Sequence, residues 1–275
     1  MTVSFLPCLV DGVVAADGRV ALRADGDAIA CGEGLFESLP VLGGAPKFLG
    51  RHLRRLAEGA AFLRLDAPDA ATVRRDVARL AAAVGAVDFS LRLTLLRDGA
   101  VSRRLCVAAP LPADVEAPVR LGWVAPPFDG PRTLGRWKTL NYLAARLAHR
   151  DGVARGFDEV LFRDVDGAAL EGTRSNLFVI EDGRLATPPT TAPVLPGVTR
   201  EVILEVARAA GVPVAEERLD ADRVFGADEA FISASVRGLR PASSIEGRPF
   251  RAVEGPVVRR LRDAYRAAFR ASDGE

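Results

Sequence analysis

The sequence predicts a mixed α/β fold, of the α+β kind, divided into two domains. Short β-type runs alternate with amphipathic helical stretches along the 275 residues, which indicates strands packed against helices. A proline-rich stretch at 110–118 is the best candidate for a linker. We therefore expect an N-terminal domain over 1–112, a linker over 113–118 and a C-terminal domain over 119–275.

The N-terminal half reads as a sheet with two helices. The expected strands run from Phe5 to Val14 with a break at Asp11-Gly12, from Leu35 to Val41, from Phe89 to Leu96 and, after a polar loop, from Leu105 to Ala109. Between them, apolar residues recur every three or four positions, as an amphipathic helix requires. They are Leu53, Leu56, Ala60 and Leu63 in a helix over 51–63, and Val73, Val77, Leu80, Ala81 and Val84 in a helix over 71–84.

The C-terminal half opens with a strand near Val119 to Val124 and a loop rich in proline and glycine. A helix after Lys138 is expected to stop at Asp151-Gly152. Asp-Gly turns are strong hairpin signals. They separate the strands Glu159 to Phe162 and Asn176 to Ile180 from their neighbours. The remaining expected elements are a helix over 199–210, a strand over 229–233 and a helix over 253–269 with Val257, Leu261, Ala264, Tyr265 and Ala268 on one face.

The overall composition excludes several classes of protein. A net charge of +1 argues against nucleic acid and anionic membrane as partners, and no apolar run approaches the length of a membrane span. Three widely spaced cysteines and no signal-peptide pattern predict a cytoplasmic protein. With two histidines, no CxxC pair and no GxSxG motif, we expect no metal site and no serine hydrolase.

Lysine is rare in this chain, because only Lys47 and Lys138 contribute to the 37 basic residues. Arginine can replace lysine on a surface, but it cannot serve as an amine nucleophile. Lys47 lies in a glycine-proline turn and is expected to be a solvated charge. Lys138 lies between apolar and aromatic residues and is the better candidate for amine chemistry.

Four motifs stand in order along the chain. They are CGEGLFE with RHLRRL (31–37 and 51–56), KTLNY (138–142), LEGTRSNLF (170–178) and LPGVTR (195–200). Together they resemble the class IV aminotransferase family, the fold-type IV pyridoxal phosphate enzymes, which includes branched-chain and D-amino acid aminotransferases and aminodeoxychorismate lyases. The resemblance implies a small N-terminal α/β sandwich domain and a larger C-terminal domain of strands surrounded by helices.

The resemblance also implies pyridoxal 5'-phosphate as the cofactor. Lys138 would hold it through a Schiff base and act as the general base at the substrate α-carbon. Arg55 would bind the phosphate, since a guanidinium matches phosphate geometry bidentately. Glu171 would pair with the pyridine nitrogen and keep it protonated, which makes the ring a better electron sink.

Further cofactor contacts follow from the same resemblance. Val198 and Thr199 would bind the phosphate at a helix N-terminus, where backbone N–H groups lack partners. Ser235 would add another phosphate contact. Tyr142 would lie near the phenolate oxygen of the cofactor, although a core aromatic residue that opens a helix explains it equally well.

The substrate contacts are where this chain departs from its relatives. Cys31 stands where many aminotransferases have an aromatic residue, which changes one wall of the pocket. The turn at Val236 and Arg237 replaces a small neutral turn, and Arg237 either binds a second substrate carboxylate or pairs with a protein acid. Arg92 and Arg97 are either pocket arginines or surface charges.

We expect an amino acid aminotransferase that moves an amino group between an amino acid and a 2-oxo acid. The motifs around Lys138 and over 195–200 favour this reaction. The alternative is an aminodeoxychorismate lyase that forms 4-aminobenzoate and pyruvate in the folate pathway, which the turn at 236–238 and the compact length favour. A cofactor-binding protein without turnover is a third hypothesis. Because relatives complete each site with a loop of a partner subunit, the resemblance implies a homodimer.

Overall fold

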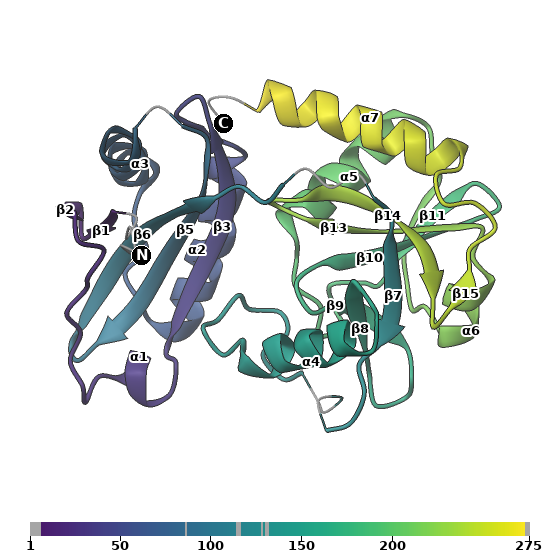
Figure 1. Ribbon diagram of the computed structural model, residues 1–275, viewed down its shortest axis with the longest axis horizontal. Helices are drawn as coiled ribbons and strands as arrows, with labels where there is room; N and C mark the ends of the chain where they lie inside the picture. Colours follow the sequence, from purple (N-terminus) through teal and green to yellow (C-terminus); the bar gives the residue numbers. More distant parts are fainter. Residues whose placement is uncertain (1–6, 86, 114–116, 128, 130–131, 273–275) are drawn as a thin grey trace. The chain divides into compact units, whose positions relative to one another are not determined.

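The computed structural model describes residues 7–85, 87–113, 117–127, 129 and 132–272, and the chain forms two compact units (Figure 1). The first unit contains the residues up to Ala113, Trp137–Asn141 and those from Ala271 onward. The second contains the residues from Asp114 to Arg136 and from Tyr142 to Arg270. Strands and helices occur in both units, which confirms the mixed α/β class. The boundaries at 112 and 119 stay a prediction, and residues 114–116 of the expected linker lie outside the described residues.

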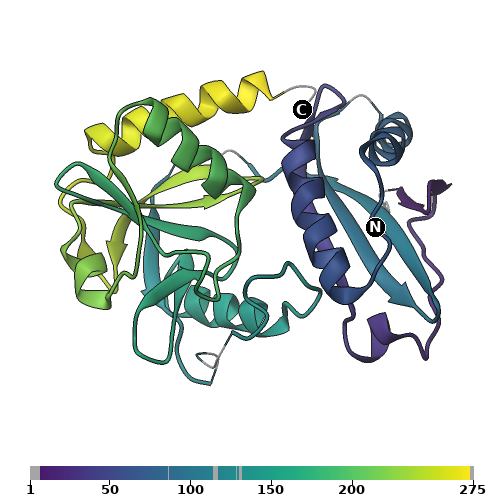
Figure 2. The same cartoon turned by 180° about the vertical axis from the view of Figure 1, so that it is seen from behind.

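The first unit is an antiparallel six-stranded sheet in the order β2-β1-β6-β5-β3-β4. Its strands are β1 Cys8–Val10, β2 Val13–Ala15, β3 Gly34–Leu42, β4 Ala45–Pro46, β5 Phe89–Asp98 and β6 Val101–Pro110, and its helices are α1 Asp27–Ala30, α2 Leu49–Leu63 and α3 Ala70–Val84. Helix α2 lies across one face of the sheet beside β3 (Figure 2). The apolar stripes expected on the two long helices are buried in one core with Leu39 and Leu91 of the sheet.

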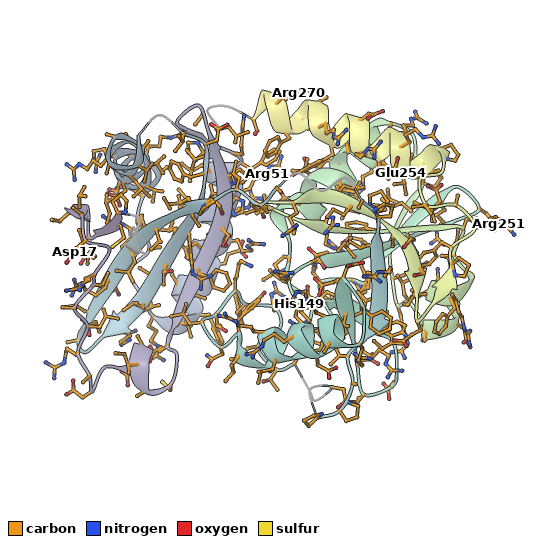
Figure 3. All side chains as sticks on the ribbon, viewed as in Figure 1. Asp17, Arg51, His149, Arg251, Glu254 and Arg270 are labelled. Carbon is orange, nitrogen blue, oxygen red and sulfur yellow. The ribbon has the colours of Figure 1, made fainter. Side chains whose placement is uncertain are left out.

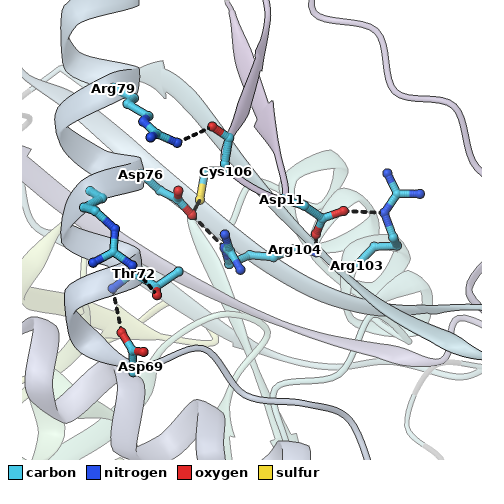
Figure 4. Close-up of polar contacts among 10 residues, drawn as sticks. Asp11, Asp69, Thr72, Asp76, Arg79, Arg103, Arg104 and Cys106 are labelled. Atoms are coloured by element: carbon cyan, nitrogen blue, oxygen red, sulfur yellow. Dashed lines mark hydrogen bonds and ion pairs between the residues drawn. The ribbon is translucent and has the colours of Figure 1, made fainter.

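The hairpin β5–β6 is longer than the sequence predicted. The expected strand began at Leu105, but β6 begins at Val101, which pairs with Asp98 across a tight turn. Ser102, Arg103 and Arg104 are part of the strand, and the side chains of both arginines reach acidic partners. Arg103 Nε donates to Asp11 at 2.5 Å (Figure 4). The break expected at Asp11-Gly12 is confirmed by positive φ values of 49° and 85°, and Phe5 and Leu6 lie outside the described residues.

A buried carboxylate ties α3 to this sheet. Asp76 accepts a hydrogen bond of 2.6 Å from Arg104 Nε and lies 3.9 Å from the Cys106 sulfur (Figure 4). Arg79 of the same helix donates to the Gly12 carbonyl at 2.7 Å. Burial, with the Asp76 charge beside it, raises the pKa of Cys106 to about 12. The thiol is therefore protonated at neutral pH.

The second unit is built on nine strands, and six of them close into a ring. The strands are β7 Val119–Trp123, β8 Glu159–Arg163, β9 Ala169–Gly172, β10 Asn176–Glu181, β11 Arg184–Thr187, β12 Val214–Glu216, β13 Glu229–Ala234, β14 Gly238–Ile245 and β15 Arg248–Pro249. The order β10-β13-β14-β7-β8-β9 closes because β9 also pairs with β10, through Glu171 and Asn176. Leu121, Leu161, Leu177 and Ile232 belong to the buried core of these strands.

Four helices accompany these strands, namely α4 Leu143–Ala154, α5 Val198–Ala209, α6 Ala221–Gly226 and α7 Pro256–Ala271. The expected stop of α4 at Asp151-Gly152 is wrong. A Cβ on Gly152 would overlap Val160 Cγ1, so this glycine permits close packing inside the helix instead of ending it. The last helix begins at Pro256 instead of 253, because proline favours the first helical position and disfavours helix before it. Elements α1, α6, β4, β12, β14 and β15 were not predicted. In the described parts of the chain, no helix is long and apolar enough to cross a bilayer.

Candidate active site

Lys138 belongs to the first unit, on a segment that pairs with the start of β3. The Lys138 carbonyl accepts a hydrogen bond of 2.9 Å from Phe36 N, and Leu140 N donates to Gly34 O at 2.9 Å. A Cβ at Gly34 would lie 2.7 Å from Leu140 Cδ1, so glycine is required for this approach. The Lys138 amine lies 4.5 Å from the centroid of the Phe36 ring. Backbone pairing therefore determines where this amine is held.

Lys47 differs from expectation. It was predicted to be a solvated charge, but it is only 4% exposed. Its backbone N donates to Pro40 O at 2.9 Å, and the buried residues Phe48 and Leu49 follow it. The close pairing of β3 with β4 therefore buries a turn that composition alone assigned to the surface.

Arg55 is held by a buried carboxylate that sequence reasoning did not single out. Its Nε donates to Glu37 Oε1 at 2.8 Å and its Nη2 donates to Glu37 Oε2 at 2.6 Å. His52 Nδ1 lies 2.6 Å from Glu37 Oε2. All three side chains are buried, with Glu37 only 1% exposed. This bidentate pair restricts the guanidinium to one orientation.

The charges of this group follow from its burial. Burial raises the pKa of Glu37, but Arg55 and His52 outweigh it and lower the pKa to about 2. Burial lowers the pKa of His52, partly opposed by Glu37, and the charges of Arg55 and Lys138 lower it further. Glu37 is thus ionised at neutral pH, and a neutral His52 donates its Nδ1 hydrogen to it. The effect of Lys138 on His52 also shows that the structure brings Lys138 close to the Arg55 group.

The other predicted residues of the first unit have ordinary contacts. The Arg92 guanidinium stacks 3.8 Å from the centroid of the Phe36 ring. Arg97 pairs with Glu33 at 2.8 Å and donates to the carbonyls of residues 63 and 64 at the end of α2, which accounts for it structurally. Cys31 is exposed and its sulfur donates to Asp27 O at 3.1 Å. The ligand atoms of Asp27, Cys31 and Glu33 lie within 4.8 Å of one another, but the ion pair with Arg97 already explains Glu33.

In the second unit, one asparagine connects two of the motifs. Asn176 Nδ2 lies 3.0 Å from Glu171 Oε2 and 2.9 Å from the Leu195 carbonyl. Leu195 N in turn donates to Glu171 Oε2 at 3.0 Å. A Cβ on Gly197 would overlap Asn176 Oδ1, so the LPGVTR turn needs its glycine here. The structure therefore joins the motif of Glu171 to the motif that opens α5.

Glu171 has a further partner that the sequence did not indicate. Arg132 Nη1 donates to Glu171 Oε1 at 2.6 Å, and its guanidinium lies 4.3 Å from the centroid of the Phe162 ring. Arg132 lies in the loop before Lys138, and the neighbouring sequence contains no motif that would indicate its role. Because Glu171 is only 4% exposed, this cation balances a buried charge.

The N-terminus of α5 is suited to an anion. Its N-cap is Gly197, which has no side chain to cap the first-turn N–H groups. Thr199 is buried there. Burial raises the pKa of Tyr265 of α7 to about 12, although the side chain of Thr199 lowers it in part, so the phenol stays protonated. A Cβ on Gly238 would lie 3.1 Å from the same ring. The tyrosine of α7 therefore packs closely against the turn between β13 and β14.

That turn carries Ser235, Val236 and Arg237. Arg237 N donates to Ala234 O at 3.2 Å, and its side chain is exposed. Within the described residues no carboxylate forms an ion pair with Arg237, so the structure does not provide the protein acid that was one alternative for it. Tyr142 is the N-cap of α4 and packs on a core cluster of the second unit.

The residues that sequence reasoning missed are Glu37, His52, Arg132 and Tyr265. A signal was available for Glu37, since an acid inside an otherwise apolar strand must find a cation when it is buried. Arg132 and Tyr265 reach their partners only through contacts between distant segments.

Comparison with known proteins adds independent information. The family model described as amino-transferase class IV matches residues 34–245. A putative branched-chain-amino-acid aminotransferase of Methanocaldococcus jannaschii is 30% identical over 253 residues, 86% of each chain. A bifunctional aminodeoxychorismate lyase / D-amino acid transaminase of Mycobacterium tuberculosis is 30% identical over 262 residues, 87% of this chain and 91% of that one. The solved structure of a hypothetical aminotransferase from M. tuberculosis, in its α-ketoglutarate and PMP bound form, superimposes with a TM-score of 0.85 at 28% identity, over 96% of this chain and 98% of that chain.

Proposed function

We propose that this chain, which belongs to the class IV aminotransferase family, is a pyridoxal 5'-phosphate-dependent amino acid aminotransferase. The observation that carries the proposal is the bridge made by Asn176 between Glu171 and the turn that opens α5. It unites an acid suited to a ring nitrogen with a helix N-terminus suited to a phosphate. A stable fold does not by itself require Glu171 and the start of α5 to be held by the same asparagine.

Groups of this chain suit the phosphate and the ring nitrogen of this cofactor. For the phosphate, the uncapped start of α5 offers the N–H groups of Val198 and Thr199, Ser235 offers a hydroxyl, and Arg55 offers a guanidinium. For the ring nitrogen, Glu171 offers a carboxylate acceptor that is paired with Arg132. When bound, the cofactor supplies an electron sink for the carbanion formed at the substrate α-carbon.

The chain's own groups would orient the reactants and move the proton. Lys138 would bind the cofactor covalently, and its released amine would then carry the proton from the α-carbon. Glu37 would hold Arg55 rigid through the bidentate pair, so that the phosphate stays in one place. Tyr142 is proposed as the contact to the phenolate oxygen.

An aminodeoxychorismate lyase is the second candidate, because a relative of equal identity carries both activities in its name. The two reactions begin with the same proton abstraction and differ in what the carbanion does next. The relative named as a branched-chain aminotransferase supports transamination as the first choice.

A half-reaction distinguishes the two. The cofactor-loaded protein is mixed with single L- and D-amino acids, and the absorbance spectrum of the bound cofactor is followed. For a transaminase, at least one amino acid converts the spectrum stoichiometrically and a 2-oxo acid restores it. If no amino acid does so while aminodeoxychorismate yields pyruvate, the lyase is the correct assignment.

The role of Lys138 is tested with a matched pair of substitutions. Lys138→Arg keeps the charge but removes the amine nucleophile, so the cofactor should no longer stay attached after borohydride treatment and denaturation. Lys47→Arg is the control, since it makes the same change at the other lysine and should retain the attachment per folded molecule. Attached cofactor in Lys138→Arg, measured by mass spectrometry, would contradict the assignment.

We also propose that the protein works as a cytoplasmic homodimer. The three free cysteines Cys8, Cys31 and Cys106 fit a reducing compartment. Sedimentation of the cofactor-loaded protein tests the dimer, and a monomer at micromolar concentration that turns over substrate would refute it.

A further inference from the structure

One end of the six-stranded ring of the second unit is lined by arginines. At this end β10 begins beside the end of β13, with Asn176 opposite Ser233. The turn before β10, Thr173-Arg174-Ser175, therefore lies next to the turn after β13, Ser235-Val236-Arg237. Two arginines from separate hairpins are brought together in this way.

A third arginine stands at the same end but inside the ring. Arg240 lies opposite Ile232 on the ladder between β13 and β14, and Ile232 and Ala242 belong to the core of the ring. Residues two apart on a strand face the same side, so Arg240 lies on the inner face, at the edge of that core. We refer to Arg174, Arg237 and Arg240 as the arginine cluster.

The positive charge of this cluster is not balanced within the described residues. Partial desolvation first, and then the charges of Arg174 and Arg240, hold the pKa of Arg237 below its ordinary value, and Glu159 opposes this only in part. The other nearby carboxylate, Asp158, is paired with Arg120 at 3.0 Å. Three guanidinium groups thus face one carboxylate.

That carboxylate is already used to build the turn. Glu159 Oε1 accepts hydrogen bonds from Thr173 Oγ1 at 2.5 Å, from Thr173 N at 3.2 Å and from Val160 N at 3.1 Å, and its Oε2 accepts from Ser175 Oγ at 3.0 Å. Burial raises the pKa of Glu159, but His149, Thr173 and the Arg174 charge outweigh it, so the pKa is lowered and the group is ionised. With four donors bound, it holds the turn of Arg174 in place.

Two buried donors next to the cluster lack acceptors. His149 lies on α4 (Figure 3), and its Nε2 accepts a hydrogen bond of 2.7 Å from Arg174 Nη2, so the hydrogen is on Nδ1. Nδ1 is buried and lies 3.6 Å from Glu159 Oε1, too far for a hydrogen bond. Arg240 donates through Nη2 to Ala117 O at 2.9 Å, but its Nε is buried without a partner. Unsatisfied buried donors are rare in folded proteins and call for an acceptor.

We propose that the arginine cluster, with His149 beside it, is a binding site for a carboxylate anion. Guanidinium groups match a carboxylate bidentately, and mouths of β-barrels are common places for small ligands. The carboxylate comes either from a dicarboxylic substrate or from a free organic acid. The substrate source rests on the proposed function. It has structural support, because the turn of Arg174 follows Glu171 in the sequence and the turn of Arg237 contains Ser235.

Binding is measured first, without turnover. Glutarate is titrated into the cofactor-loaded protein by calorimetry, with the uncharged diamide of the same acid as the ligand control. Arg237→Gln is the test variant and Arg174→Gln the second, since both side chains are exposed and neither change should prevent folding. Arg251→Gln is the matched control, because Arg251 is 83% exposed, pairs with Asp228 and lies outside the cluster.

The wild-type protein and Arg251→Gln should bind glutarate and not the diamide. Each cluster variant should bind glutarate on the order of 10- to 100-fold more weakly, as expected for the loss of a charge-assisted hydrogen bond. Absence of binding to the wild type, or equal binding by all variants, overturns the proposal.

The source of the carboxylate is then read from kinetics. If glutarate competes with the amino acid, and Arg237→Gln lowers the ratio of kcat/KM for glutamate to that for alanine at least tenfold, the site serves a substrate. If glutarate binds through the cluster without competing, the site serves a separate acid. If the wild-type protein shows no half-reaction with any amino acid, the proposed function is refuted, but the result of the binding experiment still stands.

Discussion

Replacing Glu37 by glutamine should destabilise the first unit and weaken retention of the cofactor. The carboxylate is 1% exposed and makes two hydrogen bonds to Arg55 and one to His52. Glutamine keeps the size of the side chain but removes its charge. Its amide NH2 group donates only, so it faces an N–H donor of Arg55 or His52 where the carboxylate oxygen accepted a hydrogen bond. The buried guanidinium of Arg55 then lacks the charge that balances it.

The size of the effect follows from the pKa. The fall of the Glu37 pKa from 4.5 to about 2 is worth about 3 kcal/mol, since each tenfold change in proton affinity equals roughly 1.4 kcal/mol. Removal of one partner of a buried ion pair typically costs about 3–5 kcal/mol, which agrees. Because the pKa is lowered in the folded state, this stabilisation is complete above about pH 4.5 and is lost as the pH falls toward 2.

Urea unfolding at neutral pH measures the difference, and Asp25→Asn is the control. The Arg23–Asp25 pair has a similar contact of 2.7 Å, but its side chains are 61% and 72% exposed, so its loss should cost less than about 1 kcal/mol. Repeating the experiment between pH 5 and 3 should show a smaller loss of stability in Glu37→Gln than in the wild type. Equal destabilisation by the two variants, or an unchanged acid response in Glu37→Gln, would refute the reasoning.

Two other predictions concern packing and reactivity. Gly152→Ala should destabilise the protein by about 1–3 kcal/mol despite the better helix propensity of alanine, because the new Cβ overlaps the fully buried Val160. Gly226→Ala, also at a helical glycine but in open space, should be neutral or stabilising, and equal melting temperatures for both variants would contradict this. A thiol reagent should modify the native protein once, at the exposed Cys31, because burial protects the other two cysteines and raises their pKa values. If mass spectrometry finds one label on the native Cys31→Ser variant, the modified cysteine is not Cys31 and the prediction is wrong.

Much of the local structure could be predicted because its causes are local. The helix α2 follows from apolar residues at helical spacing, and the turn at Asp11-Gly12 follows from residues that tolerate positive φ. The motifs of Glu171 and of residues 195–200 pointed to a shared chemistry because each contains its turn residues and its functional groups in one short run. The family comparison confirms the class of protein that these runs indicated.

The errors share a different cause. Gly152 was expected to end a helix because sequence neighbours do not reveal that Val160 packs against it. Lys47 was expected in solvent because the burial of its hairpin depends on the whole sheet. Arg132 carries no local mark, and only the path of its loop brings it to Glu171.

By itself, therefore, the sequence determined the class of the protein, most of its helices and strands, and the residues proposed for its chemistry. Only the tertiary structure decided what holds those residues, such as Glu37 on Arg55 and Asn176 on Glu171, and where charge is left unbalanced at the arginine cluster. The physical reason is that residue spacing governs backbone conformation over a few positions. Hydrogen bonds, burial and charge balance depend instead on segments that meet only when the whole chain has folded.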